Sequence, residues 1–395
     1  MMNLLVEGWR GVNHSFALVN QCQILELLKL PGVRLFHRDL PFAMPHWNAK
    51  TLDAGFSTQD SQRIAALDEP RGQAIDCVYR ITSPFRADAA DARPTTTFMV
   101  TEMGLSARSF EPGTDPAFFT RAGNMIVTPT RWSRDRLVEH GLDAERICVI
   151  PHGVRSDTFY PLTAAERAVN RANLGIAADE VVFLNLGAAL WNKGVDALLL
   201  GFARLRQRHS HVKLILKDQR GLYGVSVEQT IAQLVTQHPM LFSAETLSAI
   251  QVVQVNLNQA QLRLMYGVAD CYVSPYRAEG FNLPVLEAIA CGTAAVVTDG
   301  GATDDFCDAD VALRVTSTPG THDRGNPAEV ARYREPDPEA LVEALEAFCH
   351  GPAIAPAAFA RGRERLVQRL TWESVTHSLH DLLQSSTPQE LACAA

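Results

Sequence analysis

Two glutamates lie at the ends of one short segment that also contains the signals of a helix start. Glu279 and Glu287 bound the sequence EGFNLPVLE, with seven residues between them. Pro284 is typical of a first helical turn, where its missing N–H and its fixed φ are tolerated. Gly292 predicts the end of that helix. We therefore expect Glu279 in the loop before the helix and Glu287 about one turn into it.

This helix start is suited to bind an anion. The backbone N–H groups of roughly residues 281–285 are expected to point out of the helix, and together with its dipole they favour a group such as a diphosphate. Glu279 can then reach a group beyond the phosphates, while Glu287 can accept hydrogen bonds from vicinal hydroxyls, as in a ribose. The alternative is an ordinary loop acid followed by an ordinary first-turn acid. The whole pattern of spacer, proline and terminal glycine favours a nucleotide-sugar site.

A second segment places a cation after a strand. The sequence LNLGAALWNKGVDALLLGF, residues 184–202, predicts a strand ending at Gly187, a loop containing Lys193, and a helix. Departure of a nucleoside diphosphate builds negative charge, and an ammonium group directed at it would lower the barrier. Without the acidic segment, Lys193 would be interpreted as a solvated lysine before a helix.

Together these segments resemble the retaining, nucleotide-sugar-dependent glycosyltransferases of the group 1 (family four) class, which have the GT-B fold. Residues 127–161 and Thr371-Trp372-Glu373 also resemble that family, so that the resemblance covers nearly all of residues 125–385 and is weak over residues 1–124. It implies that Glu279 contacts the transferring sugar, that Lys193 neutralises the diphosphate and that Glu287 holds the ribose. It also implies that four residues between the glutamates face the sugar and phosphates, namely Gly280, Phe281, Asn282 and Leu283.

The chain departs from the family pattern at two of these positions. Glycine is usual at Asn282, and an arginine commonly follows the glycine that matches Gly187, where this chain has Ala188. The second phosphate-binding cation could be replaced by Lys217, by Arg277 or by the loop containing Arg10. Alternatively, the chain is catalytically weak or silent.

The N-terminal half carries fewer recognisable site residues. Gly11 follows the first predicted strand, in the position of the glycine loop that approaches the donor phosphate in this family. Ser15 or Asn13 is expected to cap the following helix, and His14 is a candidate acceptor contact or a solvent-facing residue. On later strand ends, Arg80 is a candidate acceptor-side cation. Glu102 stands where many relatives have a histidine near the transferring sugar, and it is either a catalytic residue in that position or a buried acid with a structural partner.

The elements that must position these residues alternate between strands and helices, which predicts an α/β protein with parallel sheets. The resemblance implies two doubly wound Rossmann-like domains that face a central cleft, with a C-terminal helix crossing back to the first domain. The expected boundaries are residues 1–165 plus 373–385 for the acceptor side, 166–372 for the donor side, and 386–395 for a flexible tail. The expected strands are residues 3–7, 33–37, 77–81, 97–101, 125–128, 147–150, 181–186, 212–216, 250–255, 271–274 and 294–298.

Composition narrows the possible partners. The 395 residues carry a net charge of −8, which argues against a nucleic-acid partner and for at most peripheral membrane contact. The eight cysteines form no C-x-x-C pair, which favours reduced thiols in a cytoplasmic protein over disulfides or zinc. Asp308-Ala309-Asp310 falls after the cleft loops, so neither a metal nor a cofactor is expected.

The predicted activity is transfer of a sugar from a nucleotide diphosphate donor to an acceptor hydroxyl, and the family resemblance implies retention of anomeric configuration. The acceptor is open: a glycan, a lipid-linked sugar, a protein or a small molecule. The alternatives are a nucleotide-sugar epimerase or phosphorylase on the same fold, and a silent sugar- or partner-binding protein. An NAD-dependent oxidoreductase is disfavoured, because no G-x-G-x-x-G follows either opening strand.

Overall fold

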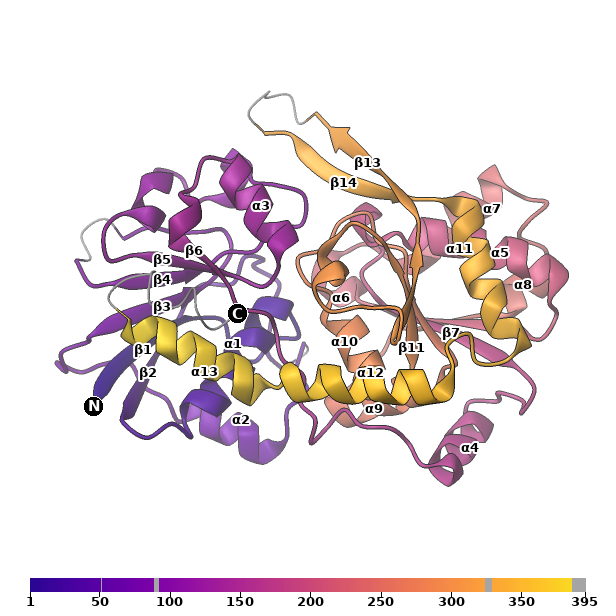
Figure 1. The fold of residues 1–395 in the computed structure, drawn as a ribbon, viewed down its shortest axis with the longest axis horizontal. Coiled ribbons are helices and arrows are strands. Elements are labelled where there is room, and N and C mark those ends of the chain that lie inside the picture. Colours follow the sequence, from indigo (N-terminus) through magenta and orange to yellow (C-terminus); the bar gives the residue numbers. More distant parts are fainter. Residues whose placement is uncertain (51, 89–91, 324–328, 386–395) are drawn as a thin grey trace. The chain divides into compact units, whose positions relative to one another are not determined.

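The computed structural model describes residues 1–50, 52–88, 92–323 and 329–385, and the chain forms two compact units (Figure 1). Unit 1 comprises residues 1–153, 323–331 and 370–395, and unit 2 comprises residues 154–322 and 332–369. The chain therefore passes from unit 1 to unit 2 at Gly153, earlier than the boundary predicted after residue 165. The predicted flexible tail, residues 386–395, lies outside the described residues.

Unit 1 is built on a parallel sheet of six strands in the order β2-β1-β3-β4-β5-β6. Their bounds are β1 Met2–Gly8, β2 Val33–Asp39, β3 Cys77–Ile81, β4 Thr95–Phe98, β5 Met125–Thr128 and β6 Ile147–Val149. The helices of this unit are α1 Ser15–Leu27, α2 Thr58–Ala65, α3 Arg131–Glu139 and α13 Trp372–Gln384. The strand predicted to reach Thr101 is the main discrepancy, because β4 already ends at Phe98.

The C-terminal helix α13 belongs to unit 1, as the family resemblance implied. It packs against α1, and Trp372 at its first position is buried with its ring 5.9 Å from the ring of His152. Gly153 lies against the backbone of Trp372, where an added Cβ would come within 2.4 Å of the Trp372 nitrogen. The last helix therefore completes the packing of the first unit.

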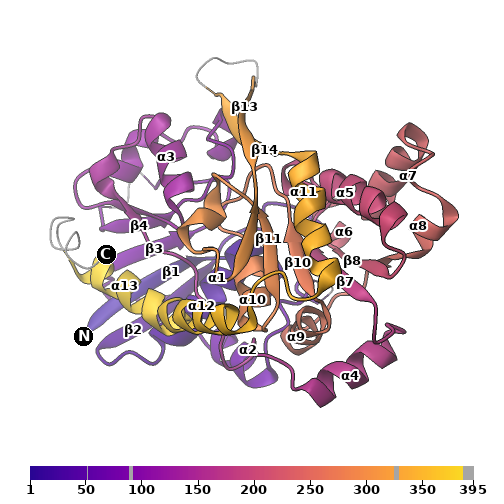
Figure 2. The same cartoon turned by 45° about the vertical axis from the view of Figure 1, so that its right-hand side comes forward.

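Unit 2 is built on a second parallel sheet of six strands, in the order β12-β11-β10-β7-β8-β9. Its strands are β7 Val181–Gly187, β8 Val212–Asp218, β9 Ile250–Val253, β10 Cys271–Ser274, β11 Ala294–Thr298 and β12 Ala312–Val315. Apolar side chains from one face of this sheet pack against α5 and α11, which lie side by side in Figure 2. The helices are α4 Ala164–Asn173, α5 Val195–Arg208, α6 Arg220–Tyr223, α7 Val227–Gln237, α8 Ala244–Ser248, α9 Gln259–Val268, α10 Leu283–Ala290, α11 Pro338–Glu346 and α12 Pro356–Arg369.

A two-stranded sheet, β13 Ser317–His322 with β14 Ala331–Pro336, was not predicted. None of the described helices is both long and apolar enough to cross a membrane. Seven cysteines lie among the described residues, and all seven are free thiols. In open α/β sheets, ligands bind at the carboxyl ends of the strands, so the loops at those ends are where substrate-binding residues are expected.

Candidate functional site

The sheet of unit 2 has a topological switch point between β7 and β10. β7 pairs with β8 on one side and with β10 on the other, so the chain reverses its direction of sheet growth at β7. Ligands of open α/β sheets bind outside the carboxyl ends of the strands at such a switch point. The loops after β7 and β10 carry Lys193 and Glu279, respectively.

Lys193 and Glu279 meet at this point. The Lys193 Nζ lies 2.9 Å from Glu279 Oε2, and the side chains are 21% and 13% exposed. Both groups are thus largely shielded while still reaching solvent, which is the condition under which a charge pair can interact strongly with a ligand. The structure therefore brings together the two residues predicted to contact the sugar and the diphosphate.

Hydrogen bonds join the two loops around this ion pair. The Asn192 carbonyl accepts from the backbone N–H groups of Arg277, at 2.7 Å, and Ala278, at 3.1 Å. The Asn192 side-chain amide donates to the Ala278 carbonyl at 3.1 Å. Sequence analysis did not select Asn192, because its role depends on two loops that are distant in the sequence.

The start of α10 has a left-handed residue where glycine is usual in the family. Asn282 adopts φ 80° and ψ 63°, and it is the one non-glycine residue with positive φ among those described. Asparagine enters this region more readily than other side chains, which explains why it can replace glycine. Its amide donates to Ser274 Oγ at 2.9 Å. The prediction of a helix start at Pro284 and an end at Gly292 is confirmed, since Gly292 has φ 89°.

One detail of the predicted anion site is wrong. The Val285 N–H was expected to point out of the helix, but it donates to the Asn282 carbonyl at 3.1 Å, and Pro284 has no N–H. The run of backbone donors predicted for the helix start is therefore shorter than expected, because neither residue 284 nor residue 285 contributes to it. Of those, Phe281 has its ring stacked on that of Phe306 with centroids 4.7 Å apart, so its side chain belongs to the core.

Glu287 is held by a buried tyrosine. The Tyr266 hydroxyl donates to Glu287 Oε2 at 2.7 Å. Burial raises the pKa of Glu287 to about 7, although this hydrogen bond acts in the opposite direction. Near neutral pH the carboxyl therefore changes between a charged and a neutral form.

The three cations named as substitutes at Ala188 are in different situations. Arg277 makes a bidentate ion pair with Asp196, at 2.7 and 2.9 Å, and a third bond to Glu335 at 2.8 Å. Arg10 makes a bidentate ion pair with Asp39 in unit 1. Both guanidinium groups are therefore engaged in the protein's own ion pairs.

Lys217 differs from these two arginines. It lies in β8 beside Leu186, one residue from the pairing of Asp218 with Gly187. Its side chain is buried, and its ammonium donates to the backbone carbonyl of Asp218. Burial lowers the pKa of Lys217 below its ordinary value. Lys217 is thus a buried cation at the end of β8; its ammonium is hydrogen-bonded to a carbonyl, and the Asp218 carboxylate favours its charged form.

In unit 1, the loop after β1 contains the predicted glycine. Gly11 has φ 81°, and its N–H donates to Gln21 Oε1 at 3.0 Å. The predicted cap of α1 was wrong: His14 is the capping residue, and its Nδ1 accepts from the Phe16 N–H at 3.2 Å. The His14 ring also lies 4.7 Å from that of Trp47. These contacts give His14 a structural role in an aromatic cluster.

Arg80, the candidate acceptor-side cation, is engaged inside unit 1, and its acceptor-side role stays a prediction. Its side chain is 2% exposed, and its Nε donates to Glu7 Oε2 at 2.7 Å. Glu7 also pairs with Arg38 at 2.8 Å, so the carboxylate lies between two guanidinium groups. Glu102 is partly buried in the loop after β4, and its backbone carbonyl accepts from the Trp132 indole at 2.7 Å. Its predicted role at the transferring sugar stays a prediction.

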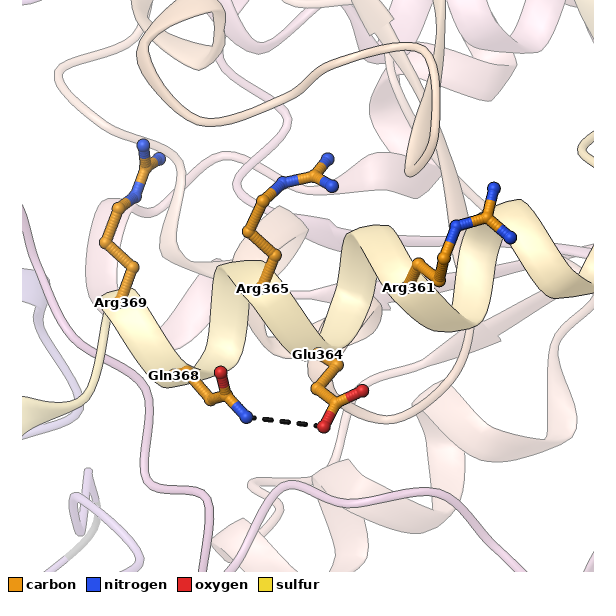
Figure 3. Close-up of a pocket in the computed structure, with 5 residues that line it drawn as sticks. All are labelled: Arg361, Glu364, Arg365, Gln368 and Arg369. Atoms are coloured by element: carbon orange, nitrogen blue, oxygen red, sulfur yellow. Dashed lines mark hydrogen bonds between the residues drawn. The ribbon is translucent and has the colours of Figure 1, made fainter.

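A hollow on the surface of α12 has a different lining (Figure 3). Arg361, Glu364, Arg365, Gln368 and Arg369 surround it, and none of these residues was predicted to bind the donor. Arg365 also contacts Asp308 at 2.5 Å and Asp310 at 3.2 Å. The two aspartates of the D-x-D sequence are therefore paired with an arginine.

The sequence also matches known proteins. Residues 166–318 match the family model described as "Glycosyl transferases group 1". The chain is 29% identical over 182 residues to mannosylfructose-phosphate synthase from Agrobacterium fabrum, covering 46% of this chain and 39% of that protein. It is 26% identical over 266 residues to alpha-maltose-1-phosphate synthase from Mycobacterium tuberculosis, covering 66% and 63%. The chain thus spans less than two thirds of the length of these relatives.

The fold of the whole chain also has solved counterparts. The structure of HepE from Anabaena in complex with UDP and glucose matches with a TM-score of 0.68 and 14% sequence identity, covering 97% of this chain and 99% of that one. This likeness establishes the GT-B fold. The predicted fold class is confirmed.

Proposed function

Because residues 166–318 match the group 1 glycosyltransferases and the chain has the GT-B fold, we propose that this protein is a glycosyltransferase. It moves a sugar from a nucleotide diphosphate to an acceptor hydroxyl, with retention of anomeric configuration and without a metal at the donor. The observation that carries this proposal is the Lys193–Glu279 ion pair at the strand switch point of unit 2. A cation beside a carboxylate is what the expected junction of diphosphate and sugar requires, and this supports the proposal.

The proposed chemistry follows from the charges of this site. When the bond between the sugar and the diphosphate breaks, negative charge grows on the leaving group and positive charge on the sugar. Lys193 and the N–H groups before Pro284 stabilise the leaving group. Glu279 orients the sugar and stabilises its positive charge, and the departing phosphate accepts the proton of the acceptor hydroxyl.

Lys217 is proposed as the second phosphate cation in place of the arginine missing at Ala188. Arg277 and Arg10 are held in bidentate ion pairs, whereas the Lys217 ammonium is bonded to a carbonyl and lies one residue from the level of Gly187. A diphosphate near Gly187 would add a second counter-charge for this buried ammonium, beside the Asp218 carboxylate. This assignment favours an active enzyme over a silent one.

The choice of substrates to assay follows from the comparisons. HepE is solved with UDP and glucose, which supports a UDP-sugar as the first donor. Two relatives are named as synthases of phosphorylated sugars, which supports phosphorylated sugars among the first acceptors. The acceptor of this chain is otherwise open.

The proposal is tested by following three products from UDP-, GDP- and ADP-sugars: nucleoside diphosphate, free sugar and glycosylated acceptor. We expect transfer to an acceptor, reduced by about 100- to 1000-fold in Lys193→Ala. Lys29→Ala, which removes an exposed lysine paired with Glu26, should match the wild type. Epimerised sugar without transfer would show an epimerase instead. A silent binding protein would show no detectable donor turnover, either in the wild type or in Glu279→Ala.

A further inference from the structure

Two histidines and a cysteine lie close together in unit 2, and the two histidines are at the amino-terminal end of β8. The proposed donor site is at the carboxyl ends of β7 and β10, in the same sheet. His209 and His211 flank the short turn between the end of α5 and the start of β8, and Cys349 lies on the turn of 3-10 helix, residues 347–350, that follows α11. One potential ligand atom from each of the three side chains lies within 4.8 Å of the others. All three residues are partly buried.

The fold holds these side chains together through its core. α5 and α11 pack side by side, and Phe348, next to Cys349, is buried in the apolar cluster on this face of the sheet. The His211 carbonyl accepts from the Val181 N–H at 2.9 Å, which fixes the turn to the start of β7. The cluster therefore joins two segments that are far apart in the sequence but rigidly placed in unit 2.

Glu346 supplies the partner that a metal-binding histidine usually has. Its Oε1 lies 2.7 Å from His209 Nε2, and its Oε2 lies 3.0 Å from Arg208 Nη1. With the proton on Nε2 donated to this carboxylate, the lone pair of His209 lies on Nδ1. A carboxylate that orients an imidazole in this way also makes it a stronger ligand.

We propose that His209, His211 and Cys349 bind a zinc ion. Two imidazoles with one thiolate match the ligand preference of Zn²⁺. Bond lengths of about 2.1 Å to nitrogen and 2.3 Å to sulfur place tetrahedral ligands about 3.3–3.7 Å apart, so side-chain shifts of about 1 Å would close the site. His350 lies beside it, with its ring 5.6 Å from that of His209, and can take the fourth position.

The proposed zinc is structural. The two histidines of the cluster precede β8, whereas Gly187 is the last residue of β7 and Glu279 follows β10 in the same parallel sheet. The ion would tie the α5–β8 turn to the end of α11, and it would not touch the donor. We therefore expect its removal to lower thermal stability and to leave donor binding intact.

The test uses the full chain, freed of metal, and titrates it with Co²⁺ and then with Zn²⁺ against a chelator of known affinity. We expect one equivalent of Co²⁺ to give the intense visible bands of a tetrahedral site and a thiolate charge-transfer band, and Zn²⁺ to displace it. Cys349→Ser should abolish the charge-transfer band. His211→Ala should weaken Zn²⁺ binding by more than about 100-fold, because losing a ligand costs more than losing a residue that only orients a ligand, which costs about 10- to 100-fold. Glu346→Gln should weaken binding by about 10- to 100-fold.

His238→Ala, which removes an exposed histidine from the same unit, is the matched control and should bind Zn²⁺ like the wild type. Circular dichroism of the metal-free variants checks that each is folded. Weak octahedral-type Co²⁺ spectra, or Zn²⁺ binding that is equal in the wild type and in the Cys349→Ser/His211→Ala double variant, would overturn the proposal.

Discussion

At the scale of single residues, the proposed donor site contains a carboxyl whose charge depends on pH near neutrality. Burial raises the pKa of Glu287 to about 7 in the folded protein, against an ordinary value of 4.5 in the unfolded chain. The folded state therefore binds more protons between these two values, and the free energy of unfolding decreases as the pH rises through that window. The charged form of Glu287 therefore lowers the stability of the folded protein at neutral pH.

This linkage predicts the behaviour of Glu287→Gln, which cannot titrate. Relative to the wild type, its free energy of unfolding should increase by up to about 3 kcal/mol between pH 5 and pH 8, because the wild type alone loses stability over that range. Denaturant unfolding at both pH values measures this difference. The exposed Glu228→Gln should show no such change. A pH-independent difference for Glu287→Gln would contradict the raised pKa.

Two glycines in one loop should respond differently to an added methyl group. At Gly187 a Cβ would approach only Asn185 Oδ1, at 3.8 Å, so Gly187→Ala should leave the unfolding temperature unchanged. If the diphosphate lies against this backbone, the donor KM should rise about tenfold or more. Gly194 has φ 69°, and its Cβ would lie 2.0 Å from the Pro275 carbonyl oxygen, so Gly194→Ala should destabilise the fold by more than about 1 kcal/mol. An unchanged KM in Gly187→Ala would place the donor elsewhere.

At the scale of elements, α10 shows what a sequence pattern can and cannot predict. Pro284 and Gly292 located the helix, since each has a backbone requirement that acts locally. The left-handed conformation of Asn282 could be anticipated only from the glycine usual at that position in the family. The use of the Val285 N–H by the Asn282 carbonyl was not predictable, because it depends on how the first turn closes.

Substitution of Asn282 tests this conformation. Asn282→Ala should destabilise the protein by about 1–2 kcal/mol, because alanine tolerates positive φ poorly and the bond to Ser274 is lost. Asn282→Gly loses the same hydrogen bond but has no steric penalty, so it should be more stable than Asn282→Ala. Thermal unfolding of both variants gives the comparison. Equal stabilities would mean that the backbone at residue 282 is not left-handed.

The other elements divide in the same way. The bounds of four strands were predicted correctly, namely β3, β5, β10 and β11. Each is a short stretch of mostly buried residues, and the residues on either side of it do not continue the strand. β13 was missed, since STPGTH contains a proline, a glycine and few apolar residues. Lys193 and Glu279 were each predicted, but their ion pair depends on β7 lying next to β10. The cluster of His209, His211 and Cys349 was missed for the same reason, since only the tertiary fold brings its parts together.

At the scale of the whole molecule, the C-terminal part of the chain returns from unit 2 to unit 1. α12 belongs to unit 2 and α13 to unit 1, where α13 packs on α1. Trp372→Ala should therefore destabilise unit 1 by about 3–5 kcal/mol, because it removes a buried indole that lies against the ring of His152. Hydrogen exchange should show faster exchange in β1–β6 and unchanged exchange in β7–β12. Faster exchange in β7–β12 instead would contradict this division of the chain.

The central claim is that unit 2 binds a nucleotide-sugar through Lys193 and Glu279. The most direct test is the unfolding temperature of the wild type and of Lys193→Ala with a panel of UDP-, GDP- and ADP-sugars, because a ligand that binds the folded state raises its stability. We predict that one donor family raises the unfolding temperature of the wild type, and that the increase is much smaller in Lys193→Ala. No increase with any donor, or an equal increase in both proteins, would contradict the claim.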